Sequence, residues 1–318
     1  MISQISAKWN FTLSRIRRDI DIPGSPERCE ERMVVEDHRQ RLFVLEKFTL
    51  GQMAHKRKMA FVLHHLKGQG IPWVYPPLNN FEQAAITRFQ GAGWQLTPFI
   101  NGVPLHRPEY AFEAWRGKVL ARVLLELQQK AGKPPGIEQG DAFSITGYVT
   151  QFTQTLKVRE SKILNQLEPV LTWLQQHFFQ VHDQIPLGFS HGDFHPINII
   201  WSKDGINGVI DWEFMGWKPE IYDLANLLGC LGMEDPPALV GDLLASLLHD
   251  LEAGKFFCPV GWQSLLDFVI ALRFAWLSEW LRKKDEEMID LELVYLNLLV
   301  ENHGDITASW NAMLPSSP

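Results

Sequence analysis

Residues 190–226 read SHGDFHPINIIWSKDGINGVIDWEFMGWKPEIYDLAN, and the polar residues best suited to chemistry are concentrated here. Asp193 is followed five residues later by Asn198. Two short apolar runs on either side of the polar turn 202–205 predict a β-hairpin, and its second strand ends at Asp211. Because a hairpin brings the two ends of its strands together, we expect Asp211 to lie beside Asn198.

These three polar residues have the chemistry that phosphoryl transfer needs. The reaction requires in-line positioning, a carboxylate near the attacking hydroxyl, and hard oxygen ligands that hold Mg²⁺ on the phosphates. One aspartate could accept the hydroxyl proton, while Asn198 and Asp211 could supply oxygen ligands. Protein kinases use the same order, with an asparagine five residues after the catalytic aspartate and a metal-binding aspartate further on. Ordinary turn residues would explain each position alone, but not all three at this spacing.

Three motifs extend the pattern in the same order: HGDFHPINII at 191–200, GVIDWEFMGW at 208–217 and YDLANLL at 222–228. Together they resemble the aminoglycoside phosphotransferase and choline kinase family, firmly over 188–232 and loosely over 30–105. The resemblance implies an α+β, bilobal protein-kinase-like fold with a small β-rich N-terminal lobe and a large, mainly helical C-terminal lobe. It also implies ATP- and Mg²⁺-dependent phosphorylation of a hydroxyl on a small molecule.

The resemblance assigns a role to each matching residue. It implies that Asp193 is the catalytic base and that Asn198 and Asp211 are Mg²⁺ ligands. His191 and Asp223 would hold the catalytic loop in place. The residues expected to border the adenine are Thr97, Phe99, Ile100, Ile200 and Ile210.

His195 lies two residues after Asp193, where protein kinases often carry a lysine that faces the transferring phosphate. Two readings stay open for it. It either donates to a phosphate oxygen, as a catalytic residue, or shapes the loop by hydrogen-bonding the backbone.

The kinase pattern is incomplete in one respect, since no GxGxxG loop is present. The candidate phosphate-covering turn, PGSPER at 23–28, contains a single glycine beside two prolines, and a plain turn explains it better.

A second departure concerns the lysine that reaches the nucleotide phosphates in kinases. The strand FVLEK at 43–47 places Glu46 in that position, and Lys47 points to the opposite face of a regular strand. The helix predicted at 52–67 has no acidic residue. We therefore expect Glu46 to form an ion pair with a basic residue of that helix. This basic residue would then lend positive charge to the phosphate site. The alternative is a β-bulge that returns Lys47 to the cleft. The candidate partners are Lys56, Arg57 and Lys58.

Composition limits the classes of protein to consider. The chain has 318 residues, of which 46% are apolar, enough for a large core or two smaller ones. A net charge of −7 argues against a nucleic-acid binder. We expect no membrane association, because no apolar run of eighteen residues and no signal-like N-terminus occur. Three widely spaced cysteines form no disulfide framework, so a cytoplasmic location is expected.

Secondary-structure patterns divide the chain near residue 100. Strand hairpins and the helix at 52–67 fill residues 1–100, which would form the nucleotide-binding lobe. Residues 101–318 would form the helical lobe with the catalytic loop and the acceptor site. The helices expected in that lobe cover 112–127, 163–174, 221–232, 237–253, 261–283 and 286–302, with a loop at 132–145.

The acceptor should bind in the second lobe. Residues 106–318 hold sixteen Lys and Arg against twenty-eight Asp and Glu, which favours a cationic acceptor such as an amino sugar, a choline-like amine or an amino acid. The stretch ALRFAWLS at 271–278 loosely resembles one in homoserine kinases of this family. Two alternatives remain: a non-catalytic nucleotide-binding module, or a protein Ser/Thr kinase. Only eleven residues separate Asp211 from Asp223, too few for the long activation segment of the latter.

Overall fold

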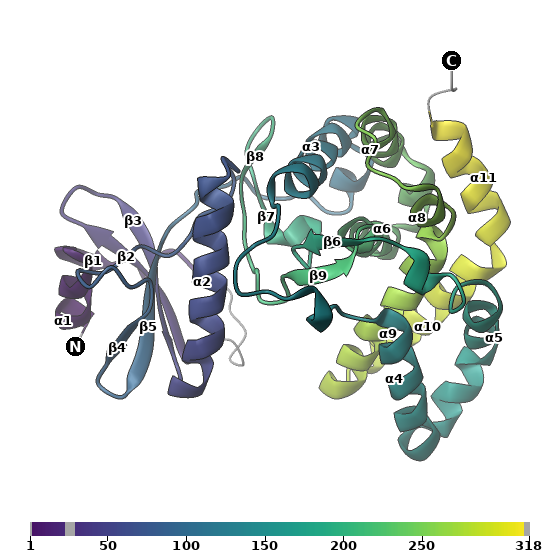
Figure 1. Ribbon diagram of the computed structural model, residues 1–318, viewed down its shortest axis with the longest axis horizontal. Helices are drawn as coiled ribbons and strands as arrows, with labels where there is room; N and C mark the ends of the chain where they lie inside the picture. The colour runs from purple at the N-terminus through teal and green to yellow at the C-terminus, as the bar shows by residue number, and fades with distance from the viewer. Residues whose placement is uncertain (1, 23–28, 315–318) are drawn as a thin grey trace.

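Strands fill the first part of the chain and helices the rest, as Figure 1 shows. The computed structural model describes residues 2–22 and 29–314. The candidate phosphate-covering turn at 23–28 lies outside the described residues. The predicted α+β organisation, with a β-rich part and a mainly helical part, is confirmed.

The β-rich part is a five-stranded antiparallel sheet in the order β1-β2-β3-β5-β4. Both expected hairpins are present within it; in the second, predicted at 84–89 and 94–100, the first strand is shorter and the second begins two residues earlier. Residues alternate across the sheet, so Leu45 packs in an apolar cluster with Ile5 and Trp9 on the outer face. The strands are β1 (Leu13–Ile16), β2 (Glu31–Asp37), β3 (Leu42–Phe48), β4 (Thr87–Phe89) and β5 (Ala92–Pro98). A short helix, α1 (Ile2–Ser6), precedes them.

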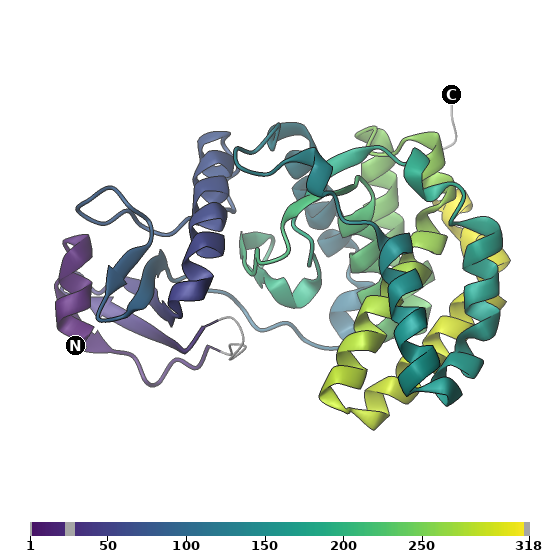
Figure 2. The same cartoon turned by 60° about the horizontal axis from the view of Figure 1, so that its bottom comes forward.

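Helix α2 (Met53–Gly68) lies between the sheet and the helical part in both Figure 1 and Figure 2. Its apolar positions recur every three or four residues and are buried, as the sequence predicts: Val62 and Leu66 are fully enclosed. These residues belong to the same apolar cluster as the core of the helical part. The packing of α2 therefore ties the sheet to the rest of the molecule, and the division at residue 100 stays a prediction.

The helical part is built on apolar stripes at helical spacing. Helix α6, which follows the third motif, is buried along almost its whole length. Nothing among the described helices is long and apolar enough to cross a membrane. The helices are α3 (Ala114–Lys130), α4 (Ile145–Arg159), α5 (Ser161–His177), α6 (Tyr222–Glu234), α7 (Asp242–Ala253), α8 (Pro259–Gln263), α9 (Leu265–Lys283), α10 (Glu286–Glu301) and α11 (His303–Met313).

Two small antiparallel strand pairs frame the central motif. The expected hairpin is formed by β7 (Ile199–Trp201) and β8 (Ile206–Val209), and it ends two residues before Asp211. A second pair, β6 (Leu187–Ser190) with β9 (Gly216–Pro219), was not predicted, because its strands are only four residues long. The catalytic-loop sequence thus leaves β6 and returns into β7.

Candidate active site

Helix α6 anchors the loop that begins at His191. Asp223, in the first turn of that helix, accepts hydrogen bonds from the backbone N–H of His191 at 2.6 Å and of Gly192 at 2.8 Å. Asp223 is buried, and burial raises its pKa to about 6 even though these two hydrogen bonds and the charge of Lys218 act in the opposite direction. The carboxylate therefore fixes the start of the loop through its backbone.

Gly192 has a backbone conformation that few other residues adopt, with φ at +86°. A Cβ atom at this position would lie 2.0 Å from the carbonyl oxygen of Phe214. The absence of a side chain lets the loop approach the segment that follows Asp211. This close approach brings the two halves of the motif together.

His191 connects Asp193 to the strand end before Asp211. Its Nδ1 accepts from the backbone N–H of Asp193 at 3.2 Å, so its Nε2 carries the hydrogen and donates to the carbonyl of Ile210 at 2.9 Å. Burial lowers the pKa of His191 to about 4, in keeping with a neutral ring. His191 thus contacts both chain segments that carry the aspartates.

Asp193 is an ionised carboxylate beside Asn198. The Asn198 Nδ2 group donates to the Asp193 backbone carbonyl at 2.9 Å and to its Oδ2 at 3.1 Å. Burial alone would raise the pKa of Asp193, but His195, His191 and Asn198 outweigh it and the pKa is lowered. His195 Nε2 lies 3.6 Å from Asp193 Oδ1, and its ring packs edge-on against Trp276. His195 therefore faces the carboxylate.

The Asn198 amide leaves an oxygen available. Because Nδ2 points at Asp193, the Oδ1 atom points away from it, and the described residues place no donor on that oxygen. The backbone N–H of Ile210 donates to the Asn198 carbonyl at 2.9 Å, which sets Asp211 beside Asn198 as expected. Asp211 itself has a left-handed backbone, with φ at 68°. One carboxylate and one amide oxygen fit Mg²⁺, which keeps several waters and takes few protein ligands.

The described residues contain no group of three His, Cys, Asp or Glu side chains able to hold a metal alone. A Mg²⁺ ion at Asn198 and Asp211 would thus depend on phosphate oxygens and water for its remaining ligands.

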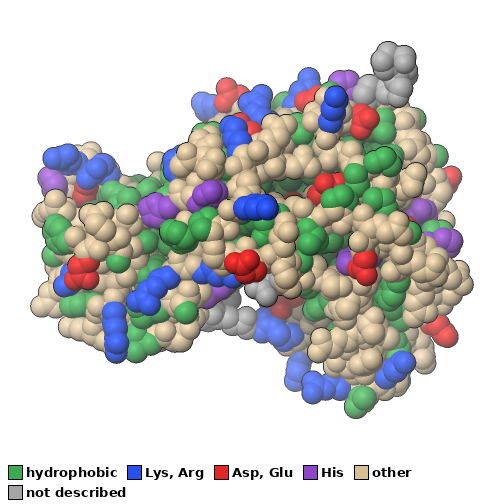
Figure 3. All heavy atoms as spheres, in the orientation of Figure 1, with side chains coloured by type: hydrophobic (Ala, Val, Ile, Leu, Met, Phe, Trp, Pro, Cys, Tyr) green, Lys and Arg blue, Asp and Glu red, His purple; other side chains and the backbone are tan. Residues whose placement is uncertain are grey.

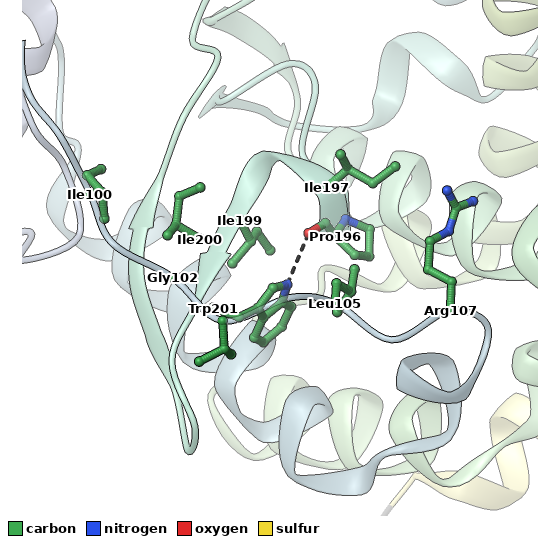
Figure 4. Close-up of a pocket in the computed structure, with 10 residues that line it drawn as sticks. Ile100, Gly102, Leu105, Arg107, Pro196, Ile197, Ile199, Ile200 and Trp201 are labelled. Carbon is green, nitrogen blue, oxygen red and sulfur yellow. Dashed lines mark hydrogen bonds between the residues drawn. The ribbon is translucent and has the colours of Figure 1, made fainter. Parts of the chain in front are cut away.

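A cavity of about 360 Å³ lies between the β5–α3 connection and the β7 strand (Figure 4). Ile100 and Ile200, both predicted to border the adenine, point into this region. Thr97, Phe99 and Ile210 are not among the described residues that line it. The cavity's remaining walls are apolar apart from Arg107, and they are Gly102, Val103, Leu105, Pro196, Ile197, Ile199 and Trp201.

The predicted ion pair of Glu46 with a basic residue of α2 is wrong. Arg32 Nη2 lies 2.7 Å from the Glu46 carboxylate, and the Gln95 amide donates to its other oxygen. The reason is register: Arg32 on β2 and Gln95 on β5 stand directly opposite Glu46, where neighbouring side chains share a face. Of the predicted partners, Lys56 bonds elsewhere, and Arg57 and Lys58 are exposed.

The alternative for Lys47 is also excluded. Strand β3 pairs with both neighbours without a bulge, so Lys47 stays on the outer face. There it contacts Glu30 at 3.2 Å and Glu31 at 3.6 Å.

Lys56 instead bridges α2 to the segment after Asp211. Its buried ammonium bonds to Glu213, and His55 Nε2 contacts the other oxygen of that carboxylate at 2.9 Å. Sequence reasoning missed Glu213, although it falls only two residues after Asp211. One signal in the sequence was available: α2 has basic residues but no acidic residue, so an ion pair made by Lys56 had to use a carboxylate from another element.

Comparison with known proteins adds a family context. A model of the phosphotransferase enzyme family matches residues 31–257. Among curated proteins, a homoserine kinase of Sinorhizobium fredii is 24% identical over 171 residues, which cover 52% of this chain and 49% of that protein. A homoserine kinase of Rhodospirillum rubrum is 28% identical over 170 residues, covering 52% and 50%. The chain thus matches about half the length of these relatives.

Solved structures share the fold over nearly the whole chain. A microcompartment-associated aminopropanol kinase superposes with a TM-score of 0.69 at 14% identity, covering 96% of this chain and 98% of that one. An aminoglycoside phosphotransferase from Alicyclobacillus acidocaldarius gives a TM-score of 0.62 at 14% identity, covering 94% and 98%. Spectinomycin phosphotransferase in complex with ADP and spectinomycin gives 0.59 at 12% identity, covering 98% and 97%.

Proposed function

The chain belongs to the phosphotransferase enzyme family, and from this premise we propose that it transfers a phosphoryl group from ATP to a hydroxyl of a small molecule. The family assignment confirms the resemblance drawn from the three sequence motifs. The observation that carries the proposal is the arrangement of Asp193, Asn198 and Asp211 around one loop, with Asp193 ionised and Asn198 turned to offer its oxygen.

Each residue of this arrangement has one task. Asp193 accepts the proton of the acceptor hydroxyl and orients its oxygen for attack. Asn198 and Asp211 hold Mg²⁺, and Mg-ATP, when bound, supplies the phosphoryl group and the metal's charge. His191 and Asp223 act through the loop backbone as positioning residues. His195, which faces Asp193, donates to the phosphate oxygens.

The nucleotide base would lie against Ile100 and Ile200 in the apolar cavity. Several structural relatives were solved with nucleotides, including an amicoumacin kinase with AMP-PNP and Ca²⁺. Glu46 is neutralised by Arg32 and therefore does not present a free negative charge to the phosphates.

The acceptor is an amine-bearing small molecule. Two relatives carry names that point this way, homoserine kinase and aminopropanol kinase. The acidic excess of residues 106–318 favours a positively charged acceptor. Trp276, which packs on His195, provides an aromatic wall close to Asp193.

The proposal is tested by ADP release from the purified chain with Mg-ATP and a panel of amino alcohols, hydroxy amino acids and amino sugars. We expect turnover with at least one acceptor. In Asp193→Asn, kcat falls roughly 10²–10⁴-fold, the usual range for a positioned acid–base group, while ATP binding is retained. The matched control is Asp290→Asn, which removes one exposed carboxylate on α10.

Two results would contradict the proposal. Normal turnover by Asp193→Asn would exclude Asp193 as the base. Tight Mg-ATP binding without ADP release for any acceptor would favour a non-catalytic nucleotide-binding module. The second result has some support in the sequence, since Glu46 replaces the strand lysine of active kinases.

A further inference from the structure

Lys218, on β9, carries a buried charge that no carboxylate neutralises. Its side chain is enclosed, with 8% of the residue exposed, and no described acidic side chain lies within ion-pair distance of its ammonium. The ammonium instead lies 5.1 Å from the ring centre of Phe143 and 4.9 Å from that of Tyr222. Burial lowers the pKa of Lys218, and the charge of Asp223 offsets this only in part. Buried lysines are rare unless they are paired, so this one calls for a partner.

The stem of Lys218 packs against the start of the proposed catalytic loop. Strand β9 pairs with β6, the strand that leads into the catalytic loop. A Cβ atom on Gly192 would lie 2.8 Å from Lys218 Cε, so the lysine stem packs directly against the residue before Asp193. The stem of Lys218 thus contacts the loop one residue before the proposed base.

Contacts lead from Lys218 to helix α9, and another residue of that helix packs on His195 beside Asp193. Phe143 packs against Tyr148 at 6.0 Å between ring centres, and the Tyr148 hydroxyl bonds to Ser278. Ser278 lies two residues after Trp276 on α9, and Trp276 packs on His195. These residues come from α4, α9, β9 and the loop before α4. Of these, Trp276 packs on His195, which lies 3.6 Å from Asp193, and the acceptor would enter along this group.

Asp223 does not serve as the counter-ion of Lys218. Its two carboxylate oxygens accept the backbone N–H groups of His191 and Gly192. No ion pair joins Asp223 to Lys218 among the described residues. The ammonium therefore keeps its hydrogen-bonding capacity for a ligand.

We propose that Lys218 binds a carboxylate of the acceptor and selects for hydroxy amino acids over simple amino alcohols. This inference rests on the proposed kinase function and names its substrate class. One ammonium matches one singly charged carboxylate, while the acidic surroundings and the aromatic wall suit the amine of the same molecule. An acceptor with all three groups, hydroxyl, amine and carboxylate, would use Asp193, the aromatic wall and Lys218 together.

Two matched pairs of acceptors isolate the carboxylate. L-Homoserine and 3-aminopropan-1-ol differ only in that group, and so do L-serine and ethanolamine. Affinity for all four is measured by calorimetry in the presence of Mg²⁺ and AMP-PNP, and kcat/KM is measured with Mg-ATP. We expect the wild-type chain to favour the carboxylate-bearing member of at least one pair.

In Lys218→Met the preference within that pair falls roughly 10–100-fold, the effect expected for losing a hydrogen bond between charged groups. Methionine keeps an apolar stem out to the ε position and lacks only the ammonium, so the packing against Gly192 is retained. Lys162→Met, which removes an exposed lysine on α5, is the matched control and leaves the preference unchanged. Circular dichroism and AMP-PNP binding show whether each variant is folded, and Lys218→Gln is a second variant if the first is not.

Three results would overturn the inference: equal wild-type affinity within both pairs, an unchanged preference in a folded Lys218 variant, or no binding of any of the four compounds. A binding preference without phosphoryl transfer would instead contradict the proposed kinase function and leave the role of Lys218 supported.

Discussion

Burial shifts the pKa values of two ionisable groups at the start of the catalytic loop in opposite directions. These groups are His191 and Asp223. Burial raises the pKa of Asp223 from 3.8 to about 6, so between these values the folded chain holds a proton that the unfolded chain has lost. Its contribution makes the free energy of unfolding fall as pH rises. Burial lowers the pKa of His191 from 6.5 to about 4, so its contribution rises with pH over nearly the same window. In the wild-type chain the two contributions largely cancel.

Asp223→Asn removes one of these opposing contributions. We expect the free energy of unfolding of the variant, relative to wild type, to increase by about 2–3 kcal/mol between pH 4 and pH 7, since one pKa unit corresponds to about 1.4 kcal/mol. Urea denaturation at several pH values measures the difference. Asp290→Asn, at an exposed site, serves as control and gives a flat difference; a flat difference for Asp223→Asn as well would refute the raised pKa.

A second prediction at this scale concerns the metal. Asp211→Ala removes one of the two proposed Mg²⁺ ligands, so Mg-ATP affinity drops by at least about tenfold and turnover is lost. Calorimetry with ATP in the presence and absence of Mg²⁺ measures the change. Asp204→Ala, on the exposed β7–β8 turn, is the control. If Asp211→Ala binds Mg-ATP as tightly as wild type, Asp211 is not a metal ligand.

The sequence predicted single residues best where local spacing sets their position. Asp193, Asn198 and Asp211 lie within one hairpin and its loop, so their proximity follows from the chain. The partner of Glu46 does not follow in this way, because it depends on which residues of β2 and β5 stand opposite. Lys218 was missed for the same reason: its neighbours come from separate elements.

At the scale of elements, α4 is the longest helix that periodicity failed to predict. Its sequence, ITGYVTQFTQTLKVR, is rich in threonine, which favours helices weakly. In the structure three of its four threonine hydroxyls bond to backbone carbonyls four residues earlier, as Thr150 does to Thr146 at 2.8 Å. Ser144 caps the helix by accepting from the Gly147 N–H. That cap was the one local signal, and packing against α9 supplies the rest.

Helices α3 and α7 pack so closely that one position tolerates only glycine. A Cβ atom on Gly117 would lie 2.1 Å from the carbonyl oxygen of Leu243 and 2.9 Å from the N atom of Leu247. Both contacts are backbone atoms, which cannot rotate away. We expect Gly117→Ala to lower the free energy of unfolding by about 1–3 kcal/mol, because overpacking outweighs the better helix propensity of alanine.

Gly304→Ala is the matched control. It lies in α11, is exposed, and has no atom within 4 Å of its Cβ position. There the propensity gain acts alone, so stability stays the same or rises by up to about 1 kcal/mol. Chemical denaturation measures both variants, and equal stabilities would show that the α3–α7 contact relaxes without cost.

At the scale of the whole molecule, α2 determines how the sheet is held against the helical part. Its apolar face belongs to the main core, His65 Nε2 contacts the Ala131 carbonyl at 3.1 Å near its C-terminal end, and Lys56 bonds to Glu213 near its start. On the face seen in Figure 3, Lys and Arg side chains are scattered over both parts rather than gathered into one patch. The contacts of Lys56 with Glu213 and of His65 with the Ala131 carbonyl join α2 to the helical part.

The ion pair between Lys56 and Glu213 should stabilise the fold, because it joins helix α2 to the segment that follows Asp211. The side chains of Lys56 and Glu213 are 5% and 15% exposed, so removing one partner leaves a buried charge unpaired. We expect Glu213→Gln and Lys56→Met each to lower the free energy of unfolding by about 2–4 kcal/mol, and the double variant to lose less than the sum. Denaturation of all four proteins gives the coupling energy.

The exposed pair Lys283–Glu279 is the comparison, with N and O 3.1 Å apart and side chains 51% and 35% exposed. Solvent screens this pair, so the same cycle should give less than about 1 kcal/mol. Amide hydrogen exchange adds a readout that stability alone does not provide. Because Glu213 joins the start of α2 to the segment after Asp211, its loss should speed exchange in the first turns of α2 more than in α9. Equal acceleration in both helices would mean that Glu213 supports the fold generally and does not specifically hold the two parts together.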